Sequence, residues 1–389
     1  MFAEDLPESV IKRLSIRVKE LNGINLGQGI PSFPTPEHII AAAREALNEK
    51  NIGVYPNYLG TLELREAIVG KLNREYELTL KATENVLVTV GAMEATASAI
   101  LSLIDSGDRV GVITPDYCNH FPQIMLARGK VVEIPLLEQK TWILDLSKVA
   151  TEAKKGLKLL ILTNPNNPTG AVFDKEQMRQ LVELADKYGF WILADETYAF
   201  LDYAQKFSSL LEFWNRSERL LVVRTFSKEY AMTGWRVGYI IANPEVIKVI
   251  AKTHDALVGC APKISQKAAV AAITGPQKIV AEFVKTLRKR RDLACELLDQ
   301  LNTYVSYAKP EGAYYIFPKY KVEKKSLDLT EQILAQAHVA VVPGAVFGQA
   351  GEGHIRISFA VEDEVLIQGI KRLEKFFEQI YTGISFLKG

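Results

Sequence analysis

The stretch RLLVVRTFSKEYAMTGWRVGYIIAN, residues 219–243, holds two apolar, β-branched runs separated by a short polar segment. Further runs of this kind are NVLVTV (85–90), RVGVITP (109–115), KVVEIPL (130–136), LKLLILTNP (157–165) and FWILADE (190–196). Several are apolar almost throughout, which is typical of strands covered on both faces of a sheet. Helical patterns such as DKEQMRQLVELADKYG (174–189) lie between them. This alternation predicts an α/β fold with a doubly wound, mainly parallel sheet of seven strands.

The pattern changes beyond about residue 245. A long charged helix is expected near 280–301, and the strand-like runs AYYIFPKY (313–320), VAVVPG (339–344) and HIRISFA (354–360) precede a final amphipathic helix near 362–380. These features predict a smaller α+β domain. We therefore expect an N-terminal arm and first part of the small domain at 1–45, a large domain at 46–285, and the rest of the small domain at 286–389.

Composition excludes several classes of function. The 47 basic and 46 acidic residues nearly cancel, which gives no support for a nucleic-acid-binding surface or a polybasic membrane patch. The N-terminus lacks an apolar core and no long apolar run follows, so neither a secretion signal nor a membrane span is expected. Cys118, Cys260 and Cys295 form no CxxC pair, which favours a reducing cytoplasm. The histidines lack metal-ligand spacing, and no metal site is predicted.

Polar residues follow several of the predicted strands, where open α/β sheets bind ligands. NPNNPTG (164–170) follows one strand, Asp195 ends another, and Gly91 follows a third and opens a helix. Thr225, Ser227 and Lys228 follow a fourth. Each feature alone has an ordinary explanation, such as a tight turn, a helix cap or a solvated lysine. Their convergence on one sheet edge favours a binding site.

The chemistry of this set indicates one cofactor. The helix start at Gly91, Ala92 and Met93 offers backbone donors for a phosphate. The hydroxyls of Thr225 and Ser227 and the guanidinium of Arg236 could bind the same phosphate. The Asp195 carboxylate suits a protonated pyridine nitrogen, and the Tyr117 ring could stack on the pyridine. Asn167 and Tyr198 could donate to a phenolate oxygen. Lys228 can condense with an aldehyde once it is deprotonated. A phosphorylated pyridine aldehyde with a phenolate is pyridoxal 5′-phosphate.

Ordered motifs along most of the chain resemble one family. They are LGQGIPSFPTPEHI (26–39), YPNYLGTLELREAI (55–68), TNPNNPTGAV (163–172), ADETYAF (194–200), TFSKEYAMTGWRVGY (225–239), PEGAYYIFP (310–318), VVPGAVFG (341–348) and HIRISFA (354–360). The chain is similar to the class I/II aminotransferases, which are fold-type I pyridoxal-phosphate enzymes, and within them to the aspartate/aromatic subgroup.

The resemblance implies a role for each matching residue. Lys228 would bind the cofactor aldehyde and shuttle the proton, with Asp195 and Tyr198 as its catalytic partners. The resemblance adds Tyr55, which would reach the phosphate of the partner subunit in a homodimer. It also implies that Arg356 binds the substrate carboxylate, together with Asn167 and the backbone at Gly29 and Ile30. It further implies a cis peptide bond between Asn167 and Pro168.

The implied activity is transfer of the amino group of an aromatic amino acid, aspartate or a broad range of donors to a 2-oxo acid such as 2-oxoglutarate, by a ping-pong mechanism. The chain departs from members of this family in two places. Met93 stands where some relatives have a hydroxyl residue. Thr253, His254 and Asp255 stand near the position at which certain aspartate-specific relatives carry an arginine. The same residues also serve carbon–sulfur β-lyases. A non-catalytic, effector-binding module is disfavoured, because LGQGIP begins at Leu26 and a DNA-binding segment would be expected before it.

Overall fold

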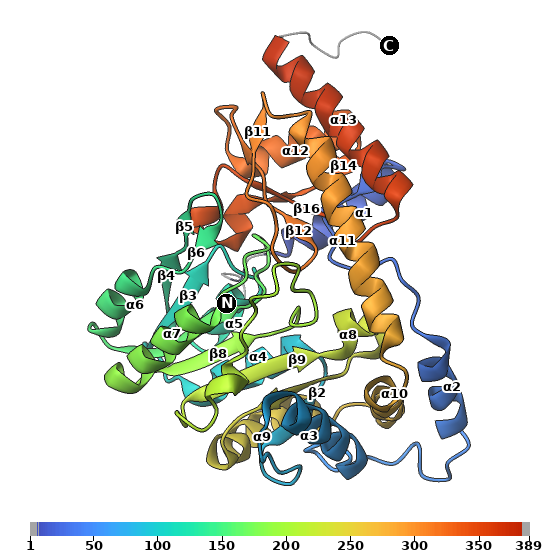
Figure 1. The fold of residues 1–389 in the computed structure, drawn as a ribbon, viewed down its shortest axis with the longest axis vertical. Coiled ribbons are helices and arrows are strands. Elements are labelled where there is room, and N and C mark those ends of the chain that lie inside the picture. Colours follow the sequence, from blue (N-terminus) through green and yellow to red (C-terminus); the bar gives the residue numbers. More distant parts are fainter. Residues whose placement is uncertain (1–5, 7, 383–389) are drawn as a thin grey trace.

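The computed structural model describes residue 6 and residues 8–382. The other residues of the predicted N-terminal arm (1–5 and 7) and the end of the predicted C-terminal domain (383–389) lie outside this range. Two units, which we call the large and the small unit, make up the described chain (Figure 1).

The large unit is built on a seven-stranded sheet in the order β2-β10-β9-β8-β7-β3-β4. The strands are β2 (Val86–Thr89), β3 (Arg109–Thr114), β4 (Lys130–Pro135), β7 (Leu157–Thr163), β8 (Trp191–Asp195), β9 (Leu220–Thr225) and β10 (Gly238–Ile241). Each coincides with one of the seven predicted runs. Only β10 runs antiparallel to its neighbours in this sheet, so the prediction of a mainly parallel sheet is confirmed.

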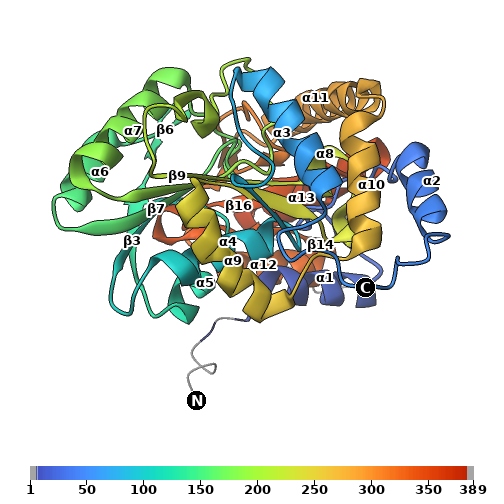
Figure 2. The same cartoon turned by 90° about the horizontal axis from the view of Figure 1, so that it is seen from below.

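Helices cover both faces of this sheet, which explains why most of its strand residues are apolar (Figure 2). One face carries α3 (Leu62–Tyr76), α6 (Leu146–Ala153), α7 (Lys175–Tyr188) and α10 (Lys263–Thr274). The other carries α4 (Ala92–Leu103), α5 (His120–Leu126) and α9 (Pro244–Val258). Successive residues of one strand contribute to opposite cores: Leu160 packs in the first and Ile161 in the second.

The local sequence sets where these helices begin and end. Asp174 caps α7 through the backbone N–H of Gln177, and the Gln177 side chain accepts from the Asp174 N–H in return. Gly189 ends the same helix in the left-handed conformation, with φ of 77°. Both boundaries agree with the predicted ones.

The small unit combines short strands with longer helices. Its strands are β1 (Ile24–Asn25), β11 (Val305–Ser306), β12 (Tyr315–Ile316), β13 (Lys319–Tyr320), β14 (Val339–Ala340), β15 (Val342–Pro343) and β16 (Ile355–Ser358). Its helices are α1 (Val10–Glu20), α11 (Lys278–Asp299), α12 (Ser326–Ala337) and α13 (Asp363–Thr382). β12, β16 and β15 form one antiparallel sheet, and β1 pairs in parallel with β14.

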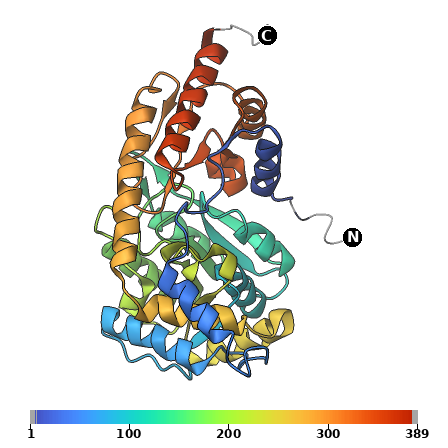
Figure 3. The same cartoon turned by 90° about the vertical axis from the view of Figure 1, so that its right-hand side faces the viewer.

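Two helices join the units. The long helix α11 runs from the large unit into the small one, where it lies beside α13 (Figure 3). The helix α2 (Glu37–Ala46) belongs to the predicted N-terminal arm, but it packs against α10 of the large unit. The remaining strands and α-helices are the hairpin strands β5 (Leu137–Glu138) and β6 (Trp142–Ile143) and the one-turn helix α8 (Phe226–Glu229). Among the described helices, none has the length and apolar character needed to cross a bilayer.

Candidate active site

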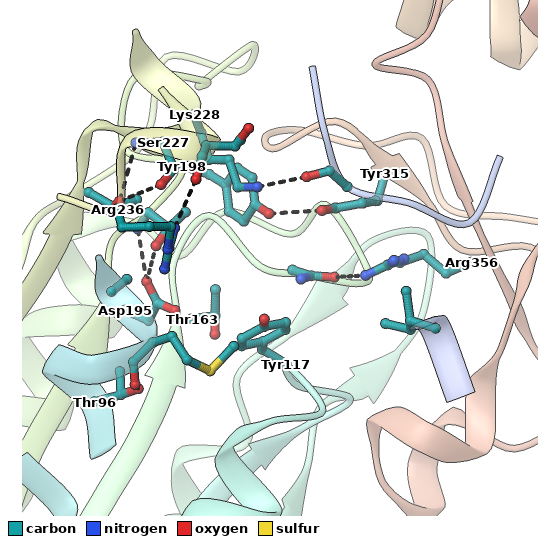
Figure 4. Close-up of a pocket in the computed structure, with 18 residues that line it drawn as sticks. Thr96, Tyr117, Thr163, Asp195, Tyr198, Ser227, Lys228, Arg236, Tyr315 and Arg356 are labelled. Atoms are coloured by element: carbon teal, nitrogen blue, oxygen red, sulfur yellow. Dashed lines mark hydrogen bonds between the residues drawn. The ribbon is translucent and has the colours of Figure 1, made fainter. Parts of the chain in front are cut away.

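A pocket of about 250 Å³ opens where the carboxyl ends of β7, β8 and β9 face the small unit (Figure 4). The large unit lines it with Ala92, Met93, Thr96, Tyr117, Thr163, Asn167, Asp195, Thr197, Tyr198, Thr225, Ser227, Lys228, Thr233 and Arg236. The small unit contributes Ile11, Gly29, Tyr315 and Arg356. The topology creates this site, because parallel strands end at the same edge of the sheet.

Lys228 lies on α8, directly after β9, and its Nζ donates to the backbone carbonyl of Gly29 at 2.6 Å. No carboxylate among the described residues forms an ion pair with it. Burial lowers the pKa of Lys228 to about 8, and the positive charges of Arg236 and Arg356 act in the same direction. A substantial fraction of this amine is therefore neutral, and nucleophilic, near physiological pH.

Asp195 ends β8 and is almost fully buried. Its Oδ1 accepts from the backbone N–H and the hydroxyl of Thr197, while its Oδ2 lies 3.8 Å from Nε2 of His120. Burial raises the pKa of Asp195. A buried carboxylate of this kind is stabilised as an anion by a cation that shares its site.

A second carboxylate orients His120 behind Asp195. Nδ1 of His120 lies 2.7 Å from Oδ2 of Asp116, and Oδ1 of Asp116 accepts from the Thr163 hydroxyl at 2.6 Å. Burial opposes protonation of His120, but Asp116 outweighs it and raises the pKa of the imidazole. The Nε2 atom of His120 is buried and has no hydrogen-bond partner among the described residues.

The start of α4 and the neighbouring loop form a cradle for an anion. Gly91 precedes the helix with φ of 77°, and a Cβ atom there would lie 2.5 Å from Nη2 of Arg236. Arg236 donates to the carbonyls of Thr233 and Val90, and forms no ion pair with a described carboxylate. The Thr225 and Ser227 hydroxyls are 3.0 Å apart at the same side of the pocket. Free backbone donors, hydroxyls and a guanidinium suit a phosphate.

Arg356 on β16 lies across the pocket from Lys228 and Asp195 (Figure 4). Its side chain is almost fully buried and donates to Oδ1 of Asn167 at 2.8 Å and to the Gly27 carbonyl at 2.6 Å. No described carboxylate pairs with it, and its Nε has no hydrogen-bond partner. A buried guanidinium that lacks an anion is a receptor for a small carboxylate. The Asn167–Pro168 peptide bond is cis, as the resemblance implied.

The family model "Aminotransferase class I and II" matches residues 22–373. The chain belongs to this family. The prediction of an aminotransferase with a fold-type I architecture is thereby confirmed.

Curated relatives and solved structures agree with this membership. The chain is 37% identical to the "Probable aspartate aminotransferase" of Methanocaldococcus jannaschii, over 91% of this chain and 93% of that protein. It is 32% identical to "Aromatic-amino-acid aminotransferase 2" of Thermococcus litoralis, over 95% and 96% of the two chains. The crystal structure of an aromatic aminotransferase from Pyrococcus horikoshii superposes with a TM-score of 0.88 at 33% identity, covering 95% of this chain and 99% of that one.

Most residues that the sequence analysis assigned to this aminotransferase site line the pocket. Gly91 lies just behind the lining, next to Arg236. Ile30 and Tyr55 do not line the pocket: the side chain of Ile30 is 44% exposed and that of Tyr55 is 90% exposed. Thr253, His254 and Asp255 also lie outside it, on α9, where His254 is buried against Glu94.

Several lining residues were not predicted. Thr163 is the last residue of β7, and Thr197 follows the end of β8 by two residues. Both could have been predicted as pocket residues, because they stand at the same strand ends as the residues that were predicted. Tyr315 was predicted only as part of a strand. His120, which approaches Asp195 without lining the pocket, was noted only for its lack of metal-ligand spacing. For these two, and for Ile11 on the distant helix α1, no pattern in the local sequence indicates the pocket.

Proposed function

We propose that this aminotransferase binds pyridoxal 5′-phosphate through Lys228 and moves the amino group of an L-amino acid to a 2-oxo acid in two half-reactions. The observation that carries the proposal is the placement of three ionisable side chains around one pocket. Lys228 is a lysine of lowered pKa, Asp195 is a buried carboxylate that lies 3.8 Å from His120, and Arg356 is a buried guanidinium that pairs with no described carboxylate. A cofactor with a ring cation and a substrate with a carboxylate would satisfy all three.

The residues present fit the cofactor. The Gly91–Met93 helix start, Thr225, Ser227 and Arg236 would hold its phosphate. Asp195 would hold a proton on its ring nitrogen, Tyr117 would stack on the ring, and Asn167 and Tyr198 would donate to its phenolate oxygen. When bound, this cofactor supplies a conjugated ring that takes up the electrons of a broken Cα–H bond.

The chain's own residues would then do three kinds of work. Arg356 would grip the substrate carboxylate through its fork of N–H groups and so fix the direction of the Cα–H bond. Lys228 would take the Cα proton as a general base and return it as a general acid. Burial by the small unit would keep water from the reacting atoms.

The lining supports a donor with an uncharged side chain, including an aromatic one. The lysine and arginine residues that line the pocket are Lys228, Arg236 and Arg356. Each already has a role, so the described lining offers no further lysine or arginine for the second carboxylate of aspartate. We propose aromatic and other uncharged amino acids as the preferred donors, with a 2-oxo acid as the acceptor.

We further propose a homodimer in which Tyr55 reaches the partner's phosphate site, because so exposed a tyrosine lacks a role within one chain. A reducing compartment such as the cytoplasm suits the three free cysteines.

A half-reaction experiment tests the activity. The protein loaded with pyridoxal phosphate is mixed with one amino acid at a time, from a panel of phenylalanine, tyrosine, kynurenine, methionine, alanine and aspartate, without acceptor. We expect the corresponding oxo acid and pyridoxamine phosphate in equal amounts, fastest for aromatic donors. Release of pyruvate and ammonia from cystathionine, without an amine form of the cofactor, would instead indicate a β-lyase.

A further inference from the structure

Tyr315 touches two parts of the site that have different tasks. It lies on β12, which pairs with the strand that carries Arg356, and its side chain is 2% exposed. Its hydroxyl oxygen lies 2.8 Å from the hydroxyl oxygen of Tyr198, and Cζ of Arg356 lies 4.3 Å from the centre of its ring. Figure 4 shows Tyr315 reaching from the small unit toward Tyr198. The residue thus bridges the two units at the pocket.

The direction of the Tyr198–Tyr315 hydrogen bond follows from the task of Tyr198. A tyrosine hydroxyl has one proton. If Tyr198 donates that proton to a phenolate oxygen in the pocket, the bond between the two tyrosines must be donated by Tyr315. A hydroxyl that accepts one hydrogen bond becomes a stronger donor in the next, so Tyr315 would strengthen the donation by Tyr198.

The ring of Tyr315 acts on Arg356. A guanidinium over an aromatic face gains a cation–π attraction that grows when the pair is removed from water. Cζ of Arg356 also lies 5.0 Å from the centre of the Phe347 ring. The two rings limit how far the plane of the Arg356 guanidinium can tilt. Its hydrogen bonds to Asn167 and Gly27 limit how far the group can rotate within that plane.

The hydroxyl of Tyr315 has little freedom to leave its place. A Cβ atom at Gly29 would lie 2.0 Å from it, so the backbone of the segment that also accepts from Lys228 packs directly against this hydroxyl. A glycine at position 29 is therefore required for the bridge.

We propose that Tyr315 is a positioning residue that acts through two contacts: its hydroxyl strengthens Tyr198 as the donor to the cofactor's phenolate oxygen, and its ring holds Arg356 in the plane that receives the substrate carboxylate. This inference rests on the proposed function of the pocket. It assigns separate consequences to the hydroxyl and to the ring, so that the two can be tested apart.

The hydroxyl is tested by a pH titration of the visible absorbance of the cofactor-loaded protein. That titration reports the proton on the nitrogen that joins Lys228 to the cofactor. Weaker donation to the phenolate oxygen leaves more negative charge beside this nitrogen and raises its pKa. Tyr315→Phe should raise the midpoint by about half a pH unit or more, and Tyr198→Phe should raise it at least as far. In the Tyr198→Phe background, Tyr315→Phe should add no further shift.

The ring is tested by steady-state kinetics of Tyr315→Phe against Tyr315→Leu and Tyr315→Met. The phenylalanine variant keeps the ring, so its KM for the amino donor should stay at the wild-type value. The aliphatic variants should raise that KM by about fivefold or more, as expected for the loss of a buried cation–π contact.

Tyr203→Phe is the matched control. Tyr203 is also buried in the small unit, donates its hydroxyl to the Ala313 carbonyl at 2.8 Å, and has Cζ of Arg291 at 4.7 Å from its ring centre, but it does not line the pocket. This variant should change only the melting temperature.

Three results would overturn the proposal: an unshifted midpoint in Tyr315→Phe, an equal shift in the Tyr198→Phe background, or an unchanged KM in both aliphatic variants. A wild-type protein that gains no visible absorbance with pyridoxal phosphate would instead refute the proposed function itself.

Discussion

The side chain of Lys228 carries the clearest prediction at the scale of single residues. Burial and two nearby arginines lower its pKa to about 8, whereas a hydrogen bond from Lys248 to Glu245 raises the pKa of that exposed lysine above its ordinary value. Because only the neutral amine reacts, labelling of the apo protein by an amine-reactive reagent should reach half its maximal rate near pH 8 at Lys228 and well above that pH at Lys248. Mass spectrometry of the two peptides measures this. Equal profiles for the two lysines would contradict the lowered pKa.

Asp195 provides the second prediction at this scale. An asparagine at position 195 keeps the size of the side chain but cannot hold a proton on a ring nitrogen as a carboxylate does. We expect Asp195→Asn to bind the cofactor and to lose about two orders of magnitude or more in kcat. Absorbance of the loaded variant controls for binding. Retention of most of the activity would show that the carboxylate has no such role.

Sequence reasoning at this scale selected pocket residues near strand ends and missed those that only tertiary packing brings there. Lys228, Asp195 and Asn167 could be chosen because each stands at the end of a predicted strand or within a few residues of it. His120 approaches Asp195 only because α5 begins next to the sheet edge, and Tyr315 approaches Tyr198 only because the units close on each other. Tyr55 is exposed in the single chain, which agrees with its proposed role toward a second subunit.

At the scale of elements, the close approach of β10 to the start of α4 supports the anion cradle. A Cβ atom at Gly238 would lie 2.9 Å from the carbonyl carbon of Gly91 and 3.0 Å from the nitrogen of Ala92. Gly238→Ala should displace the helix start and weaken cofactor binding about tenfold, since overpacking costs about 1–3 kcal/mol. Gly234→Ala is the control, because a Cβ atom there meets no atom within 4 Å. Fluorescence titration with pyridoxal phosphate compares them, and equal affinities would contradict the packing argument.

The cap of α7 yields a prediction on stability alone. Asp174→Ala removes the hydrogen bond that the Asp174 side chain accepts from the backbone N–H of Gln177 and should lower the free energy of unfolding by about 1 kcal/mol. Glu183→Ala, on the same helix but in an exposed pair with Arg179, should change it by less than about 0.5 kcal/mol. Urea denaturation measures both, and kcat should be unaffected. Similar values for the two variants would mean that the cap contributes nothing.

Elements of the large unit were predictable because their sequence signals are local. The seven runs were recognised as strands, since burial on both faces makes several of them apolar almost throughout. The short strands of the small unit were located less closely: the run 313–320 contains two separate strands, β12 and β13, joined to different partners. Two-residue strands are defined by their neighbours rather than by a pattern of their own.

At the scale of the whole molecule, we propose that the chain passes from one unit to the other at two places. One boundary lies just before α2 and the other lies within α11. Val280 packs against the large core, whereas Val284 and Leu287 pack in the small one. The contact of α2 with α10 places residues 37–46 with the large unit. The sequence led us to expect two units. It could not show which unit receives a connecting helix, because an amphipathic face fits either core.

Exposed apolar side chains near the pocket support the proposed homodimer. Leu257 and Val258 are 52% and 40% exposed and line a second hollow together with Met93 and Arg236. Leu257→Asp should shift the protein from dimer to monomer in light scattering and weaken cofactor binding. Val365→Asp, on α13 of the small unit, should do neither. A dimer that tolerates Leu257→Asp would place the interface elsewhere.

The most direct test of the account concerns the bond between Lys228 and pyridoxal phosphate. Protein loaded with the cofactor is reduced with borohydride, digested and analysed by mass spectrometry. The account predicts a stable pyridoxyl phosphate adduct on the peptide that contains Lys228 and its loss in Lys228→Ala. An adduct spread over surface lysines, or one that persists in Lys228→Ala, would contradict it.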